Sequence, residues 1–140
     1  MKNSAGSIVI RPGFVVATVT ALLGTFMLAA GIWAVIAPAS FAEFTHYALS
    51  EHFVHDAGAF QIGIGATLFL SLVVRDSVVV ALAGYLVSNS IHAVNHAIDL
   101  HLGGHRSDFW LLAGISVITA IALVMHLRAI ARSKNPGEYR

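Results

Sequence analysis

The sequence predicts an all-α integral membrane protein, built as a bundle of four spanning helices. Its 140 residues are 57% hydrophobic and only 11% charged, whereas soluble domains carry about 25% charged residues. The apolar residues gather into four runs, each near the ~20 residues that a helix needs to cross a bilayer. The basic residues lie almost wholly on one side of the topology that these runs define. The length fits a single domain.

The four predicted spans cover residues 14–36, 57–74, 77–98 and 109–127, and residues 128–140 form a polar tail. The first run holds no charge and stops before Pro38, which cannot continue a helix. This run is longer than the roughly 7–15 apolar residues of a signal peptide, so we treat it as a span. Arg75 and Asp76 form a tight, water-exposed turn between the second and third runs.

Small residues on the first two spans predict close packing between helices. Gly58, Gly63 and Gly65 lie on the second span, and Gly24 and Gly31 lie on the first. Glycine lets the backbones of two helices approach each other in a membrane. We therefore expect these positions to face a neighbouring helix.

The first connection, residues 39–54, is expected to hold a short amphipathic helix. Ser40 and Glu43 have the spacing of a capping box, and Phe41 and Phe44 follow at helical spacing. A segment of this kind lies on the membrane face with its apolar side in the lipid. The alternative is a plain loop.

The distribution of charge predicts that both termini lie in the cytoplasm. Seven of the eight Lys and Arg residues fall on the side of the termini, and they are Lys2, Arg11, Arg75, Arg128, Arg132, Lys134 and Arg140. The other side holds Arg106 and the acidic residues Glu43, Glu51, Asp56, Asp99 and Asp108. Cytoplasmic connections of membrane proteins carry the excess of Lys and Arg, so this acidic side is the expected outer side. A net charge of +1 gives no reason to propose nucleic acid as a partner.

Histidines concentrate on the expected outer side and predict a site there. His92 and His96 are one turn apart at the end of the third span, so they share a helix face. His55 and Asp56 precede the second span at nearly the depth of His96. An ionisable group inside a membrane costs free energy and persists mainly where it has a partner or a function. We therefore expect these four side chains to be metal ligands.

Further polar residues lie around this set. The side chains expected to orient the ligands are Asp99, Asn95, Ser88 and Gln61. Additional candidates are His46, His52, His101 and His105, in segments expected to be in water, where a histidine costs little. The eighth histidine, His126, lies beside Arg128 at the opposite interface, and we interpret it as a snorkelling residue without a special role.

The favoured function is an outward-facing site for a divalent transition metal such as zinc, copper or iron, which imidazole ligands suit. A b-type haem with His92 and His55 as axial ligands is a second cofactor hypothesis. The histidines could instead handle protons. They could also hydrogen-bond within an accessory or homo-oligomeric subunit of a membrane complex that holds no cofactor. The absence of cysteine excludes thiolate and iron–sulfur sites, and no nucleophile–base pair, phosphate loop or hydrolase motif supports an enzyme.

Two stretches of the chain resemble a known group of proteins. They are EHFVHDAGAFQIGIGATLFLSLVVRD and GYLVSNSIHAVNHAIDL, with Asp56-Ala57-Gly58 and His92-x-x-x-His96 as their most specific features. These stretches resemble small uncharacterised four-helix membrane proteins of actinobacteria, which are loosely similar to the DoxX-like group. The resemblance covers about the middle half of the chain. It implies a four-helix fold in a bacterial plasma membrane and no established activity.

Overall fold

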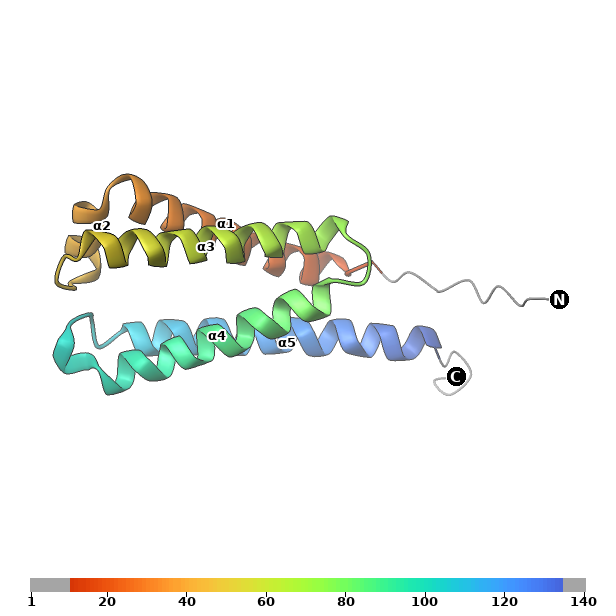
Figure 1. The fold of residues 1–140 in the computed structure, drawn as a ribbon. Helices are drawn as coiled ribbons and strands as arrows, with labels where there is room; N and C mark the ends of the chain where they lie inside the picture. The colour runs from red at the N-terminus through yellow and green to blue at the C-terminus, as the bar shows by residue number, and fades with distance from the viewer. Residues whose placement is uncertain (1–10, 135–140) are drawn as a thin grey trace.

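A computed structural model of the protein describes residues 11–134, and these residues form two helical hairpins (Figure 1). The elements in chain order are α1 (Phe14–Ile36), α2 (Pro38–Thr45), α3 (Glu51–Val73), α4 (Val78–Ile98), the 3₁₀ turn η1 (Leu100–Leu102) and α5 (Asp108–Lys134). Helices α1, α3, α4 and α5 are each long and apolar enough to cross a membrane. The prediction of an all-α protein with four candidate spans is therefore confirmed for the described part of the chain.

Most helix boundaries lie within a residue of the predicted ones, and two differ. Helix α3 begins at Glu51 instead of residue 57, so the histidines of this segment lie in the first turns of a helix. Helix α5 continues to Lys134, beyond residue 127, so part of the predicted tail is helical. Hydropathy marks where a helix leaves the lipid, whereas the helix itself continues into water as long as its hydrogen bonds are made. Lys2 and Arg140, which the orientation argument counts, lie outside the described residues.

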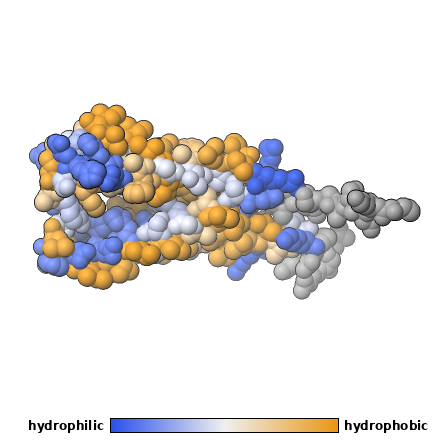
Figure 2. All heavy atoms as spheres, in the orientation of Figure 1, coloured by the Kyte–Doolittle hydropathy of each residue, from blue (hydrophilic) through white to orange (hydrophobic). Residues whose placement is uncertain are grey.

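The two ends of the molecule differ in composition. The basic end holds the start of α1, the α3–α4 turn and the end of α5, with Arg11, Arg75, Arg128, Arg132 and Lys134. The opposite end, which we call the histidine end, holds α2, η1 and the connections beside them, with His46, His101 and His105. Figure 2 shows hydrophilic residues at both ends, hydrophobic residues along the flanks, and a hollow between the two hairpins towards the histidine end.

Helices α1 and α3 pack closely because paired glycines remove side chains from their contact. A Cβ atom on Gly31 would lie 2.6 Å from the carbonyl oxygen of Gly58, and one on Gly58 would lie 2.8 Å from that of Gly31. Gly24 and Gly65 form a second pair, since a Cβ on Gly65 would lie 2.9 Å from the Gly24 oxygen. The packing prediction is confirmed for these four glycines. It is wrong for Gly63, which has no neighbour within 4 Å of a Cβ.

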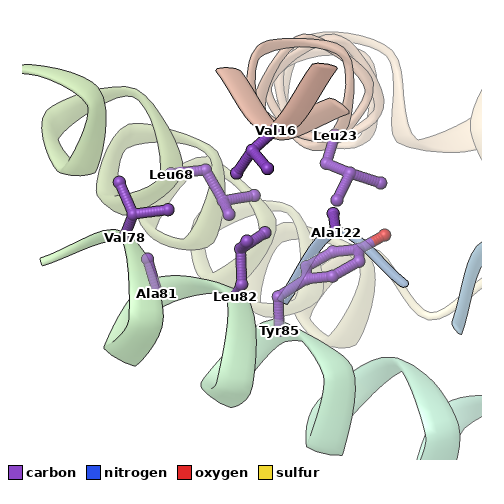
Figure 3. Packing of buried hydrophobic residues seen from close by; sticks show 8 residues of the cluster. All are labelled: Val16, Leu23, Leu68, Val78, Ala81, Leu82, Tyr85 and Ala122. Carbon is purple, nitrogen blue, oxygen red and sulfur yellow. The ribbon is translucent and has the colours of Figure 1, made fainter. Parts of the chain in front are cut away.

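The two hairpins share a buried apolar cluster in the half of the bundle nearer the basic end (Figure 3). All four long helices contribute to it, with Val16, Leu23, Leu68, Val78, Ala81, Leu82, Tyr85 and Ala122. Towards the histidine end, the hairpins diverge in Figure 1, and their connecting segments contact each other there through Gly104 and His46. The core therefore fixes one end of the bundle, and the connections hold the other.

Helix α2 folds back against the end of α1. Pro38 is its first residue, a position where the missing proline N–H is not needed. The ring centroids of Phe41 and Phe44 lie 5.6 and 5.1 Å from that of Trp33. A short helix is thus present in the first connection, but the predicted capping box is wrong. Ser40 lies inside the helix, where its hydroxyl accepts a hydrogen bond from Trp33 Nε1 at 3.3 Å.

Candidate functional site

His92 and His96 lie next to each other near the end of α4, as their spacing predicts. Their ring centroids are 4.6 Å apart, and the rings are nearly perpendicular at 86°. The His96 side chain is 13% exposed, whereas His92 is an exposed residue of the chain. One helical turn therefore supplies two adjacent imidazoles, one of them accessible from the surface.

His96 has an acidic partner in Asp108, the first residue of α5. The Asp108 Oδ2 atom lies 3.4 Å from His96 Nδ1. The backbone N–H of His105 donates a hydrogen bond to the same oxygen at 2.8 Å. Gly104 leaves room for this carboxylate, since a Cβ there would lie 3.2 Å from Oδ2. The turn before α5 therefore holds the carboxylate against the imidazole.

Tyr47, from the α2–α3 connection, is a second neighbour of His96. Its hydroxyl lies 3.5 Å from His96 Nδ1, and the two ring centroids are 5.9 Å apart. Burial raises the pKa of the Tyr47 hydroxyl, and the negative charges of Asp108 and Asp99 raise it further. The phenol therefore stays protonated at neutral pH and is available as a hydrogen-bond donor.

The α2–α3 connection contacts the turn before α5, which joins the two hairpins at the histidine end. The backbone N–H of Gly104 donates to the carbonyl oxygen of His46 at 3.3 Å. The rings of His46 and His105 have centroids 4.0 Å apart. Gly103 has a φ of 142°, and a Cβ there would lie 2.7 Å from the His46 oxygen. This contact brings two of the additional candidate histidines together beside the Asp108 turn.

His55 and Asp56 lie apart from this cluster. Within residues 11–134, no hydrogen bond, ion pair or ring contact joins His55 to His92 or His96. Asp56 contacts His52, one turn earlier, with 3.5 Å between Oδ2 and Nε2, and both side chains are exposed. Over the same described range, no group of three or more His, Asp or Glu side chains is arranged to hold a metal ion.

Among the described residues, no hydrogen bond or ion pair joins the residues expected to orient the ligands to His92 or His96. Ser88 donates to a backbone carbonyl of its own helix, and Gln61 Oε1 is buried without a hydrogen-bond partner among the described residues. Asn95 is exposed, and Asp99 is half-buried. His101 is exposed and lines a shallow depression near the turn before α5.

Sequence reasoning missed Asp108 and Tyr47 as site residues and misinterpreted His126. Tyr47 is separated from His96 by 49 positions along the chain, so only the packing of the connections brings them together. Asp108 follows His105 by three residues, a spacing at which a carboxylate accepts a backbone N–H at a helix start, and this pattern could have identified it. His126 does not snorkel to the interface, since it is 3% exposed and lies in the bundle interior.

A search for matching protein families, curated proteins and solved structures finds none for this chain. The chemistry of the site follows from its own residues. A carboxylate beside one imidazole nitrogen fixes the tautomer and orientation of the ring, which leaves the other ring nitrogen available to a ligand. The imidazole of His92 lies beside that of His96 and provides a second possible ligand.

Proposed function

We propose that this protein is a multi-pass membrane protein that binds a divalent transition metal between His92 and His96, with Asp108 orienting His96. The observation that carries the proposal is the 3.4 Å approach of Asp108 to His96 Nδ1. Histidines that bind metals usually donate their second ring nitrogen to a carboxylate or carbonyl. With Nδ1 turned to Asp108, His96 presents Nε2 to the metal.

His92 provides the second ligand of the proposed site. Two imidazoles one turn apart suit zinc, copper, iron or nickel, and water or a substrate would complete the coordination. His55 and Asp56, the ligands expected from the sequence on α3, are not required for this pair. They remain candidate third and fourth ligands for a state in which the hairpins lie closer together at the histidine end.

A titration of the purified, tag-free protein with Zn²⁺ or Cu²⁺, after treatment with a chelator, tests the proposal. The wild type is expected to bind about one ion per chain. His96→Ala should abolish this binding, and Asp108→Asn should weaken it about 10–100-fold, as loss of an outer hydrogen bond does. His52→Ala is the matched control, because His52 is also one turn from a potential ligand but is exposed and contacts Asp56 instead of Asp108. Stoichiometric binding that survives the double variant His92→Ala/His96→Ala would contradict the proposal.

The same sample tests the haem hypothesis. A haem bound through a histidine gives a Soret band in the visible spectrum, and its loss in His92→Ala would favour this cofactor over a bare metal ion. A wild-type protein that takes up zinc and shows no Soret band favours the metal site.

The proposed location is a bacterial plasma membrane with both termini in the cytoplasm and the histidine end outside. The five basic residues at the basic end of the described chain support this orientation. The chain has no cysteine, so a single introduced thiol reports its own side. Arg106→Cys should react with an impermeant maleimide in whole cells, and Arg75→Cys should react only after the cells are opened. The reverse pattern would contradict the orientation. On this orientation, α2 is proposed to lie on the outer membrane face, with the exposed Phe44 ring in the lipid.

A second candidate function is that of a subunit in a homo-oligomer or larger membrane complex. Gly63, Gly84 and Gly114 are exposed on three different helices, with nothing within 4 Å of a Cβ position. Glycines on the outer surface of spanning helices let another helix approach. Chemical crosslinking in native membranes, repeated with leucine at each glycine, distinguishes this function. Assembly that is lost in these variants favours it, and a monomer in the wild type contradicts it.

A further inference from the structure

Polar side chains follow the contact between α4 and α5 along most of its length. We call this set the polar seam. Its members are Tyr85, Asn89, His92 and His96 on α4, and Asp108, Ser116, Thr119 and His126 on α5. The α4 residues are spaced four, three and four apart, so they lie on one face of the helix.

Direct contacts connect the part of the seam nearer the histidine end. His96 lies 3.4 Å from Asp108. Asn89 Nδ2 donates to the carbonyl oxygen of Leu112 and to Ser116 Oγ, both at 2.8 Å. Ser90 Oγ donates to the same Ser116 Oγ at 3.2 Å. These contacts join α4 and α5 through polar groups in the part of the hairpin nearer the histidine end.

The part of the seam nearer the basic end contains buried polar atoms without partners. Tyr85 and His126 are each 3% exposed, and within the described chain neither the Tyr85 hydroxyl nor His126 Nδ1 has a hydrogen-bond partner. The Tyr85 ring reaches from α4 to Ala122 of α5 (Figure 3). Ala122 and His126 are four residues apart and share a face of α5. About 6 Å, one helical turn, therefore separates the level of Tyr85 on α5 from that of His126.

Burial without a partner is costly for these two groups, because inside a membrane they find no bulk water. Buried polar groups in this situation are commonly satisfied by ordered water molecules that make two to four hydrogen bonds. The hydroxyl of Thr119, which is fully buried on α5, donates to a carbonyl oxygen of its own helix. The lone pairs of this hydroxyl oxygen remain available to such water.

The length of the polar seam is close to the thickness of the hydrocarbon core of a bilayer. Asp108 and His126 are the outermost members on α5, and eighteen residues separate them, which corresponds to about 27 Å along a helix. The hydrocarbon core of a bilayer is about 30 Å thick. The titratable groups along this path are Asp108, His96 and His92 at one end, Tyr85 in the interior, and His126 at the other end.

We propose that the polar seam holds ordered water beside Tyr85 and His126 and conducts protons between the two ends of the bundle. A proton enters from the water at the histidine end. Each water or hydroxyl along the path then accepts one proton and releases another, and a proton leaves from His126 at the basic end. No electron is transferred, and a pH gradient or membrane potential drives the flux. This function does not depend on the proposed metal site.

Proton flux into liposomes that contain the full-length protein tests the proposal. A potassium gradient with valinomycin supplies the membrane potential, a pH-sensitive dye inside reports proton entry, and a chelator keeps metals out. The wild type is expected to conduct protons faster than protein-free liposomes. Tyr85→Phe and His126→Phe, which retain ring size but remove the polar atoms, should reduce the rate to that of protein-free liposomes. His101→Phe, on the exposed turn, is the control and should conduct like the wild type.

Two results would overturn the proposal. One is a wild-type rate equal to that of protein-free liposomes, and the other is an unchanged rate in both folded seam variants. Should the variants fail to fold, solid-state NMR of the wild type with ¹⁵N-labelled histidine decides the matter. The His126 ring nitrogens should exchange magnetisation with water despite their burial, and a dry His126 would equally overturn the proposal.

Discussion

Both hairpins pair two long apolar helices, but the helices of each pair contact each other through different groups. In the α1–α3 hairpin, Gly31 faces Gly58, and Gly24 faces Gly65, so that backbone meets backbone. In the α4–α5 hairpin, side chains make the contact, with the Asn89 amide donating to Ser116 of the facing helix. Lipid is as apolar as leucine, so burial of apolar side chains gives two spanning helices little reason to associate. Close packing and interhelical hydrogen bonds are the two remaining means, and each hairpin relies mainly on one of them.

This difference separates a structural part of the molecule from the part that carries candidate chemistry. A glycine contact leaves no functional group at the helix interface. A hydrogen-bonded contact requires polar groups in the interior, and those groups are also able to bind a metal or carry a proton. The proposed metal site and the proposed proton path therefore both lie on the α4–α5 hairpin. Helices α1 and α3 contribute apolar residues to the core.

The largest expected effect comes from filling the glycine contact. Gly31→Leu places a side chain where even a Cβ would lie 2.6 Å from the backbone of α3. The helices must separate, which we expect to lower the free energy of unfolding by about 3 kcal/mol or more. Unfolding by titration with a denaturing detergent measures this. Ala59→Leu, at an exposed position beside Gly58 on α3, is the matched control, and an equal loss in both variants would show that the glycine contact is unimportant.

A smaller effect is expected where the connections join the two hairpins. Gly103 has φ 142° and ψ −175°, a conformation that is essentially restricted to glycine. Gly103→Ala should therefore cost about 2 kcal/mol, and the exposed Ser107→Ala should cost nothing measurable. Hydrogen exchange at the Gly104 amide, which donates to His46, should accelerate in the first variant only. Unchanged exchange would indicate that the hairpins stay together without this contact.

Removing the hydrogen bonds of the α4–α5 contact should have a moderate effect. Asn89→Leu loses the two bonds to α5, and such bonds contribute about 1 kcal/mol in membrane proteins. Asn95→Leu, exposed on the same helix, should leave the free energy of unfolding unchanged. If Asn89→Leu is as stable as the wild type, both hairpins are held by packing and the comparison between them fails.

The smallest effect concerns pH. Because the folded state raises the Tyr47 pKa above 10, the folded chain keeps this proton to a higher pH than the unfolded chain. The contribution of the neutral phenol to stability is complete below pH 10 and is lost as the pH rises through the raised pKa. Titration of phenolate absorbance in the wild type and in Tyr47→Phe isolates this group. A Tyr47 that titrates at its ordinary value would show that it is not held near Asp108.

The sequence was sufficient to predict the four apolar helices and the adjacency of His92 and His96. Span length depends on bilayer thickness, and residues one turn apart meet in any helix. Both features are local, so no knowledge of the partner helices was needed. Helix α3 begins at Glu51, six residues before the predicted start of the second span at residue 57, because apolar content does not mark where a helix begins in water.

The partners of these histidines depended on tertiary structure. His55 was the expected partner, on the basis of equal depth, but depth does not specify which helices are neighbours or which way their faces turn. Asp108 takes the place beside His96 because α4 and α5 form one hairpin and the turn between them brings the two residues to the same level. The position of His126 beside Arg128 likewise predicted an interface residue. The rotation of α5 about its axis instead places the His126 side chain inside the bundle.

The sequence by itself determined that four helices of this chain are long and apolar enough to span a membrane, which end of the fold is basic, and which histidines share a face. The tertiary structure decided which polar groups meet. Four helices of similar length and hydropathy can be paired and rotated in many ways. The choice depends on a few contacts at close range, the glycine pairs 24–65 and 31–58 and the bonds of Asn89. Those contacts join residues that are far apart in the chain, so they cannot be predicted from the spacing of residues or from the composition.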